Sequence, residues 1–83
     1  MKYDIVIQKS AEKFLRNQNT KTQERLLKAI YRLPDGTDIK KIKGHNLYRL
    51  RIGNYRVIYS IDDSVKIIAV EDIDNRGDVY KRI

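Results

Sequence analysis

The sequence predicts an α+β domain in which a helical hairpin packs on a mostly antiparallel four-stranded sheet, in the order β-α-α-β-β-β. Three observations support this class: alternating apolar residues on both sides of Gly53-Asn54, two segments with apolar residues at helical spacing, and apolar strands at both ends of that set. We find no repeat, linker or low-complexity tract. We therefore expect residues 1–83 to form one domain, whose size can support a modest core.

The N-terminal segment Lys2–Gln8 alternates apolar and polar side chains, which predicts a first strand. Ser10 is then a candidate N-cap for a first helix, and the polar run Asn17–Asn19 ends that helix. The apolar residues on the inner face of this helix are Ala11, Phe14 and Leu15.

A second helix follows the polar break. Thr20 and Gln23 have the spacing of a capping box at its start. Pro34 and Asp35-Gly36 end it, because proline disfavours helical geometry in the residue before it. Its apolar residues at helical spacing are Leu26, Leu27, Ile30, Tyr31 and Leu33. We interpret the two helices as a hairpin whose shared apolar face covers a sheet.

The stretch Leu47–Ile61, LYRLRIGNYRVIYSI, predicts a β-hairpin that turns at Gly53-Asn54. Glycine accepts the positive φ that a two-residue turn demands, and the flanking residues alternate with a period of two. Tyr48, Tyr55 and Tyr59 then point inward, and we expect them to belong to the core.

The same turn places Arg51 opposite Arg56, with Arg49 two residues along on the face of Arg51. Like charges directly opposite each other destabilise a sheet, whereas the planar guanidinium fork matches phosphate. Two interpretations remain open at this point. The three arginines form a site for a polyanion, or they form an ordinary solvated face beside acids from a neighbouring strand.

The other segments complete the predicted order. Thr37–Asn46 is expected to be a basic connection, and Val65–Ile73 to be a further strand. The run Ile67–Val70 in that strand indicates a central position with both faces buried. We expect a turn at Asn75–Asp78 and a short tail, Val79–Ile83, that returns toward the sheet.

The net charge of +7 is concentrated in one stretch. No acid lies between Asp38 and Asp62, whereas the basic residues of the other segments nearly equal the 11 acids of the chain in number. The basic residues of this stretch are Lys40, Lys41, Lys43, Arg49, Arg51 and Arg56. Concentrated positive charge favours a nucleic acid through counterion release, with an acidic polypeptide as a second partner. We therefore expect Lys40, Lys41, Lys43 and His45 to bind a nucleic acid, although a lone loop histidine is more often a solvated side chain.

Several function classes are excluded by composition. There is no cysteine, so disulfides and thiolate metal sites are ruled out. No apolar run has membrane-spanning length and no secretory segment begins the chain, so we expect a soluble cytoplasmic protein without membrane contact. We expect no metal and no cofactor, and interpret Asp72, Asp74 and Asp78 as carboxylates that orient Arg76.

The motifs resemble the RelE/ParE superfamily of bacterial and archaeal toxins. The matching pieces are Tyr-Arg-Leu-Arg before the turn, Gly-Asn-Tyr-Arg-Val-Ile-Tyr across it, and Asn-Arg-Gly-Asp-Val-Tyr near the C-terminus. The β-α-α order and the chain length agree, so the resemblance covers essentially the whole chain.

The resemblance implies a toxin of a type II toxin–antitoxin pair, held inactive in a hetero-oligomer with its cognate antitoxin. RelE-like members cleave mRNA, usually in the ribosomal A site, by attack of the 2′-hydroxyl on the adjacent phosphate without a metal. The resemblance implies that the catalytic residues are Arg49, Arg51, Arg56, Arg76 and Tyr80.

Two departures from the best-known RelE pattern bear on the general base. Two positions that are often lysine are arginine here, and arginine does not act as a base near neutral pH. The separation of Arg76 from Tyr80 is also shorter. The candidates for the base are Tyr80, His45, Lys41 and Lys43.

The alternative function is a ParE-like protein that inhibits DNA gyrase through a protein contact and lacks nuclease activity. ParE-type chains generally lack the full basic and aromatic set, which favours the nuclease. A member that has lost activity, or a basic RNA-binding module, is a third possibility.

Overall fold

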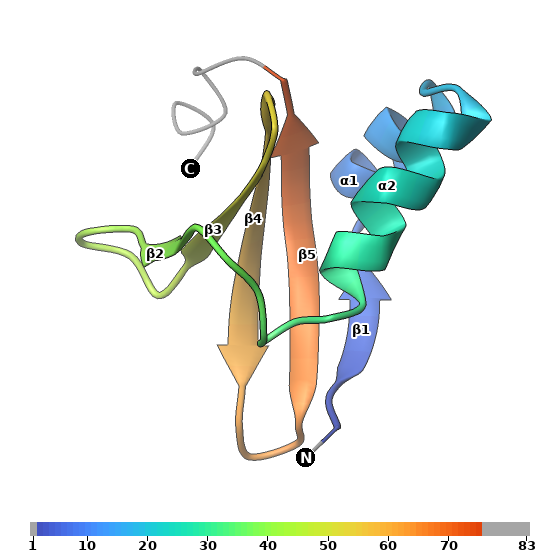
Figure 1. The fold of residues 1–83 in the computed structure, drawn as a ribbon. Helices are drawn as coiled ribbons and strands as arrows, with labels where there is room; N and C mark the ends of the chain where they lie inside the picture. Colours follow the sequence, from blue (N-terminus) through green and yellow to red (C-terminus); the bar gives the residue numbers. More distant parts are fainter. Residues whose placement is uncertain (1, 76–83) are drawn as a thin grey trace.

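The computed structural model describes residues 2–75 and places two helices on one face of a five-stranded sheet (Figure 1). The elements are β1 (Asp4–Ile7), α1 (Lys9–Arg16), α2 (Thr20–Ile30), β2 (Ile39–Lys41), β3 (Tyr48–Ile52), β4 (Tyr55–Asp62) and β5 (Ile67–Asp74). The predicted turn at Asn75–Asp78 and the tail Val79–Ile83 lie almost wholly outside the described residues.

The strands lie in the order β1-β5-β4-β3-β2, and only the β1–β5 pair is parallel. The predicted α+β class is therefore confirmed, but the predicted count of four strands is wrong. The additional strand, β2, lies inside the segment Thr37–Asn46 that we expected to be a connection, and it pairs antiparallel with β3. β2 has only three residues, two of which are lysines, so its sequence shows too little apolar alternation to predict a strand without knowledge of its partner β3.

Both predicted helix caps are wrong by one or two residues. Gln8 occupies the N-cap of α1 without a side-chain hydrogen bond, and the Ser10 hydroxyl instead donates to Asp72 Oδ1 over 2.8 Å. At α2 the N-cap is Asn19, whose side-chain oxygen accepts from the Thr22 amide at 2.8 Å. Asparagine caps helices as well as threonine does, so α2 begins one residue after Asn19 rather than after the predicted cap Thr20.

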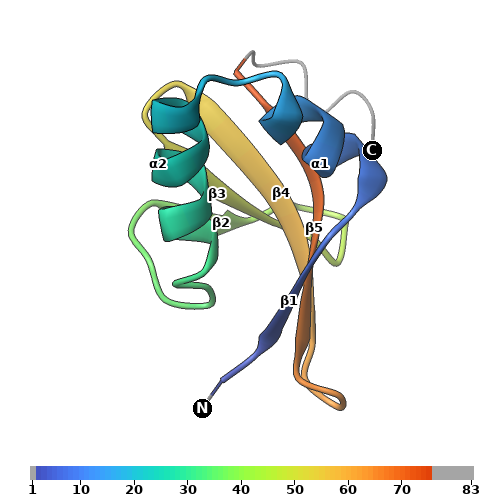
Figure 2. The same ribbon diagram turned by 90° about the vertical axis from the view of Figure 1, so that its right-hand side faces the viewer.

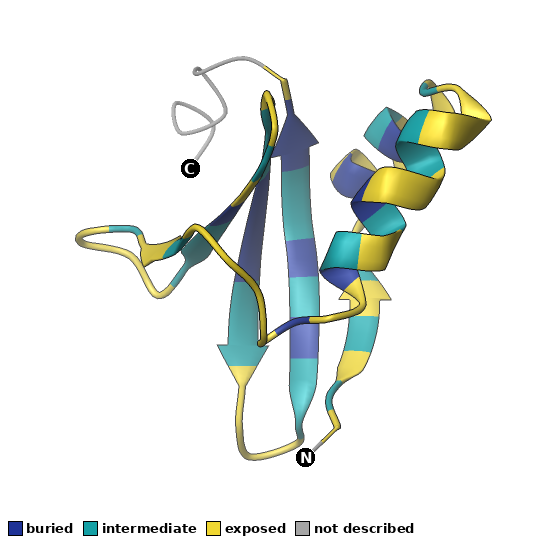
Figure 3. Cartoon of the chain, viewed as in Figure 1, coloured by how far each residue is buried: buried dark blue, intermediate teal, exposed yellow. Residues whose placement is uncertain are grey.

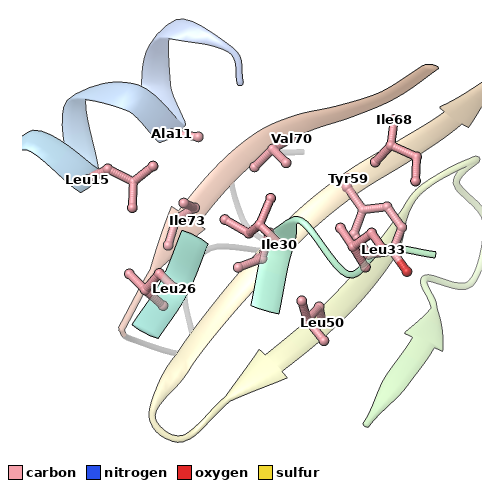
Figure 4. Packing of buried hydrophobic residues seen from close by; sticks show 11 residues of the cluster. Ala11, Leu15, Leu26, Ile30, Leu33, Leu50, Tyr59, Ile68, Val70 and Ile73 are labelled. Carbon is pink, nitrogen blue, oxygen red and sulfur yellow. The ribbon is translucent and has the colours of Figure 1, made fainter. Parts of the chain in front are cut away.

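The core lies between the helices and the sheet, and Figure 4 shows Leu26 and Ile30 of α2 directed toward Ile73 and Val70 of β5. Viewed from the helix side, α1 lies near β5 (Figure 2), while Arg25 of α2 reaches the turn between β3 and β4. The buried residues of this cluster are Ala11, Leu15, Leu26, Ile30, Leu33, Leu50, Val57, Tyr59, Ile68, Val70 and Ile73. Burial is concentrated on the facing surfaces of α1, α2 and the central strands, whereas β2 is largely exposed (Figure 3).

The inward tyrosines of the hairpin pack as expected. Tyr59 is 1% exposed and stacks on Tyr48, with 5.5 Å between ring centroids. Tyr55 meets Phe14 of α1 edge to face at 6.0 Å. Tyr31, by contrast, is 61% exposed because α2 ends at Ile30, one residue before it.

The prediction that β5 is buried on both faces is only half right. β5 has a neighbour on each side, but Ile68 and Val70 are buried while Ile67 and Ala69 are half-buried. The helices cover one face of the sheet, and this difference follows from the alternation of side chains along a strand. Among residues 2–75, no helix is long and apolar enough to cross a membrane.

Candidate nucleic-acid interface

A hollow of about 530 Å³ lies at the tip of the β3–β4 hairpin. This tip and the C-terminal end of β5 lie at the same end of the sheet (Figure 1). The lining residues come from α2, the hairpin and the end of β5: Arg25, Arg51, Gly53, Asn54, Tyr55, Arg56 and Asn75. We call this set the hairpin-tip site. Its lining within residues 2–75 contains three arginines and no carboxylate.

The hairpin register places two of these arginines side by side, as predicted. Arg51 pairs with Arg56 and Ile52 with Tyr55 across the Gly53-Asn54 turn. Their neighbours Leu50 and Val57 belong to the core, so strand alternation turns Arg51 and Arg56 to the face opposite the helices. Two guanidinium groups thereby share one end of that face, where they can donate to the same anion.

Arg49 lies on the same face but is held by an acid. Its Nη2 donates to Asp38 Oδ1 at 2.7 Å and to the Asp38 carbonyl at 3.4 Å, and its side chain is only 12% exposed. Arg51 Nε lies 3.7 Å from Asp38 Oδ2 with its side chain 43% exposed. The arrangement thus combines the two interpretations of the sequence. Asp38 binds Arg49 through Nη2, although the buried Arg49 Nε has no hydrogen-bond partner within residues 2–75, while Arg51 and Arg56 line the hollow.

Arg25 is the residue of this site that the sequence analysis missed. It is exposed on α2, yet its guanidinium lies against the hairpin turn. A Cβ built on Gly53 would lie 2.5 Å from Arg25 Nη2 and 3.2 Å from Cζ. One signal was available: the positions three and four residues away on α2 hold no acid that would pair with it.

The lysines predicted to bind RNA are divided between the two faces of the sheet. Lys40 pairs with Arg49, so it lies on the sheet face that carries Arg49, which we call the arginine face. Lys41 pairs with Tyr48 and lies on the opposite face, together with the core-packed Ile39. Lys43 and His45 follow in the exposed connection to β3, where the His45 amide donates to the Ile42 carbonyl at 3.2 Å. None of these four residues lines the hairpin-tip site.

Two predicted catalytic residues, Arg76 and Tyr80, lie outside the described residues, and so does Asp78. Of the acids expected to orient Arg76, Asp74 pairs with Arg56 in the sheet and is 4% exposed. Asp72 accepts from Ser10 on α1. Within residues 2–75, no group of three histidine or carboxylate side chains is placed to hold a metal ion.

Burial raises the pKa of the Tyr59 hydroxyl to about 12, and Tyr48 adds to the shift. Tyr59 is therefore a neutral core residue at physiological pH rather than a proton acceptor. The tyrosine that lines the hollow, Tyr55, has its ring packed on Phe14.

The fold and the hairpin-tip site define a small, basic α+β domain with an arginine-lined hollow. A family model described as the ParE toxin of the type II toxin–antitoxin system parDE matches residues 5–80. A protein of Methanocaldococcus jannaschii, provisionally named toxin RelE1, is 33% identical, with 98% of each chain covered. The chain therefore belongs to the RelE/ParE family of type II toxin–antitoxin toxins, as its motifs predicted.

Solved structures agree with this assignment. The archaeal RelE–RelB complex from Pyrococcus horikoshii contains a chain that matches with a TM-score of 0.75 and 32% identity, covering 93% of this chain and 98% of that one. The E. coli RelBE complex matches with a TM-score of 0.74, covering 90% of this chain and 98% of that one. At 20% identity the second likeness shows the fold alone.

Proposed function

We propose that this toxin is an endoribonuclease that cleaves mRNA, with the hairpin-tip site as the place where the scissile phosphate binds. The observation that carries the proposal is the pairing of Arg51 with Arg56 at the rim of a hollow whose described lining residues include no carboxylate. Two adjacent guanidinium groups repel each other in the free protein, and a bound phosphate converts that repulsion into two charge-assisted contacts.

The proposed reaction needs no metal. The 2′-oxygen of the RNA attacks the adjacent phosphorus, the bond to the 5′-oxygen breaks, and the products are a 2′,3′-cyclic phosphate and a 5′-hydroxyl. Negative charge develops on the phosphoryl oxygens, where Arg51 and Arg56 donate. The 2′-hydroxyl loses a proton to a base and the 5′-oxygen gains one from an acid.

We assign Arg76 to the same phosphate and Tyr80 to proton transfer, following the family pattern. Lys41, Lys43 and His45 were the other candidates for the base, and none of them lines the hairpin-tip site. Arg49 is assigned a supporting role, because Asp38 already occupies its guanidinium. Lys40 shares the arginine face, where it can contact RNA beyond the cleavage point.

We further propose a cognate antitoxin and the ribosomal A site as partners, in the cytoplasm. Support for the antitoxin comes from the RelE relatives of P. horikoshii and E. coli, which were solved in complex with RelB. Support for the ribosome rests on the RelE name of the M. jannaschii relative.

A second function, inhibition of DNA gyrase, is favoured by one observation: the matching family model is that of ParE toxins. Gyrase inhibition needs a protein contact and no phosphate chemistry. The two functions therefore differ in what happens to mRNA after the toxin is induced.

The test is induced expression of Arg56→Ala, with Arg16→Ala as the matched control. Arg16 is an arginine of α1 whose side chain is 76% exposed, and it does not line the hairpin-tip site. We expect Arg56→Ala to lose cleavage by about a hundred- to a thousandfold, the usual cost of removing one donor to developing charge. Arg16→Ala should keep full activity. Arg56→Lys should recover little cleavage, because the single ammonium group of lysine does not replace the bidentate contact of a planar guanidinium group.

Growth arrest, its relief by the co-expressed antitoxin, and primer-extension mapping of transcripts are the measurements. Arrest by the unmodified protein with uncut messages would refute the nuclease and support gyrase inhibition. Unchanged cleavage by Arg56→Ala would refute the role of the hairpin-tip site.

A further inference from the structure

Several hollows lie on the surface of the described residues, and two of nearly equal volume differ in charge. The first, of about 540 Å³ between β1 and the segment after α2, carries Lys2 and Arg32 but also Asp4 and Asp35. Its charges balance, so it offers an anion no net attraction. Among the described residues that line the hairpin-tip site there are three arginines and no acid, although Asp38 and Asp74 lie beside Arg51 and Arg56 in the sheet. The lining within residues 2–75 therefore favours a negatively charged ligand.

Arg25 enters the hairpin-tip site from the helix side. Arg51 and Arg56 belong to the sheet, whereas Arg25 projects from α2 and passes over the turn between them. Gly53 leaves room for the Arg25 guanidinium beside the turn. Its φ of +57° suits the turn, and it has no Cβ, which would meet Arg25 Nη2 at 2.5 Å.

Within residues 2–75, neither Arg25 nor Arg56 takes part in an ion pair. Folding alone offers no reason to bring a third guanidinium to the pair formed by Arg51 and Arg56, because the added repulsion costs free energy. An exposed arginine on a helix can extend into water at no such cost. A ligand with more than one negative charge removes the penalty.

We propose that Arg25 is a further substrate-binding residue, which contacts a phosphate of the RNA from the helix side of the hairpin-tip site. This inference rests on the proposed function, since it takes the ligand to be RNA. Arg51 and Arg56 hold the scissile phosphate from the sheet, and Arg25 holds the backbone of the neighbouring nucleotide. The RNA strand is then bound by arginines of the sheet and by an arginine of the helix layer, which fixes its direction across the hairpin turn.

The test compares Arg25→Ala with Lys28→Ala. Both changes remove one positive charge from the exposed side of α2, but Lys28 does not line the hairpin-tip site. The probe is a fluorescein-labelled RNA oligonucleotide in which every 2′-hydroxyl carries a methyl group, so attack by a 2′-oxygen is blocked. Its affinity is measured by fluorescence anisotropy over a range of salt concentrations, and thermal melting checks that each variant is folded.

We expect Arg25→Ala to bind the probe about tenfold more weakly at low salt, as the loss of one charge-assisted contact implies. The slope of log affinity against log salt should become shallower by about 0.7, the value for one phosphate of a single strand. Arg25→Lys should keep the slope, because it keeps the charge. Lys28→Ala should match the unmodified protein in slope, since it removes no phosphate contact.

The outcomes separate this inference from the proposed function. Equal slopes for Arg25→Ala and Lys28→Ala, with messages still cut by the unmodified protein, would overturn the Arg25 inference alone. An Arg25-dependent slope in a protein that cuts no message would overturn the nuclease and keep Arg25 as a phosphate contact. An unmodified protein that cuts messages but does not bind the probe would overturn the Arg25 inference alone, and one that neither binds the probe nor cuts messages would overturn both.

Discussion

Replacing Arg49 with alanine tests whether this arginine serves the fold or the chemistry. The change removes a 2.7 Å hydrogen bond to a carboxylate and the packing of a side chain that is 12% exposed. Hydrogen bonds to charged groups contribute about 1.5–3 kcal/mol. Asp38 is 45% exposed, so solvent screening reduces this value, and we expect a loss of about 1–2 kcal/mol in the free energy of unfolding.

Arg51→Ala is the matched control, because Arg51 lies on the same strand and face and approaches the same Asp38. Its distance is 3.7 Å and its side chain is 43% exposed, so we expect a loss of no more than about 0.5 kcal/mol. In a domain of this size each kcal/mol lowers the melting temperature by about 4–8 °C. Urea denaturation and thermal melting, both followed by circular dichroism, measure the two losses.

Equal destabilisation by the two substitutions would contradict this reasoning. So would an Arg49→Ala variant that is as stable as the unmodified protein but has lost cleavage. That second result would return Arg49 to the catalytic set implied by the family resemblance.

Two further predictions concern the lysines and the core. Lys40→Ala should make the slope of log affinity for RNA against log salt shallower by about 0.7. Lys41→Ala changes the opposite face of the sheet and should leave this slope unchanged. Equal effects of the two changes would show that RNA wraps around the edge strand β2. Because the pKa of Tyr59 is raised to about 12, folding favours its neutral form. Its contribution to the free energy of unfolding is complete below pH 10 and declines by about 1.4 kcal/mol per pH unit between pH 10 and 12. Denaturation across this range should show a steeper decline for the unmodified protein than for Tyr59→Phe, and parallel curves would contradict the assignment.

The hairpin was predictable because its information is local. Gly53-Asn54 and the flanking alternation determine the turn, the turn determines the register, and the register places Arg51 beside Arg56. No distant segment is needed for any of these steps. The same is true of the two helices, apart from the first residue of each and the end of α2, which stops at Ile30 rather than at Pro34.

β2 and the position of Arg25 could not be predicted in this way. Ile39–Lys41 becomes a strand only because β3 offers it a free edge, and its sequence has too few residues to show a period. Arg25 occupies an ordinary exposed helical position, and its contact with Gly53 depends on how α2 packs across the hairpin. A contact between the helix layer and the sheet produces no periodic pattern in the sequence of either segment.

Asp38 explains why three arginines on one face have different surroundings. It adopts a φ of +58° just before β2, a conformation that aspartate tolerates better than most residues. From there its carbonyl accepts the Arg51 amide at 3.2 Å, while its carboxylate binds Arg49 at 2.7 Å and lies 3.7 Å from Arg51. One residue thus anchors the start of β2 to β3 and neutralises the arginine farther from the turn. Arg51 lies farther from this carboxylate, and Arg56 takes part in no ion pair within residues 2–75, so both guanidinium groups remain able to bind a ligand at the hairpin tip, which Arg25 also approaches.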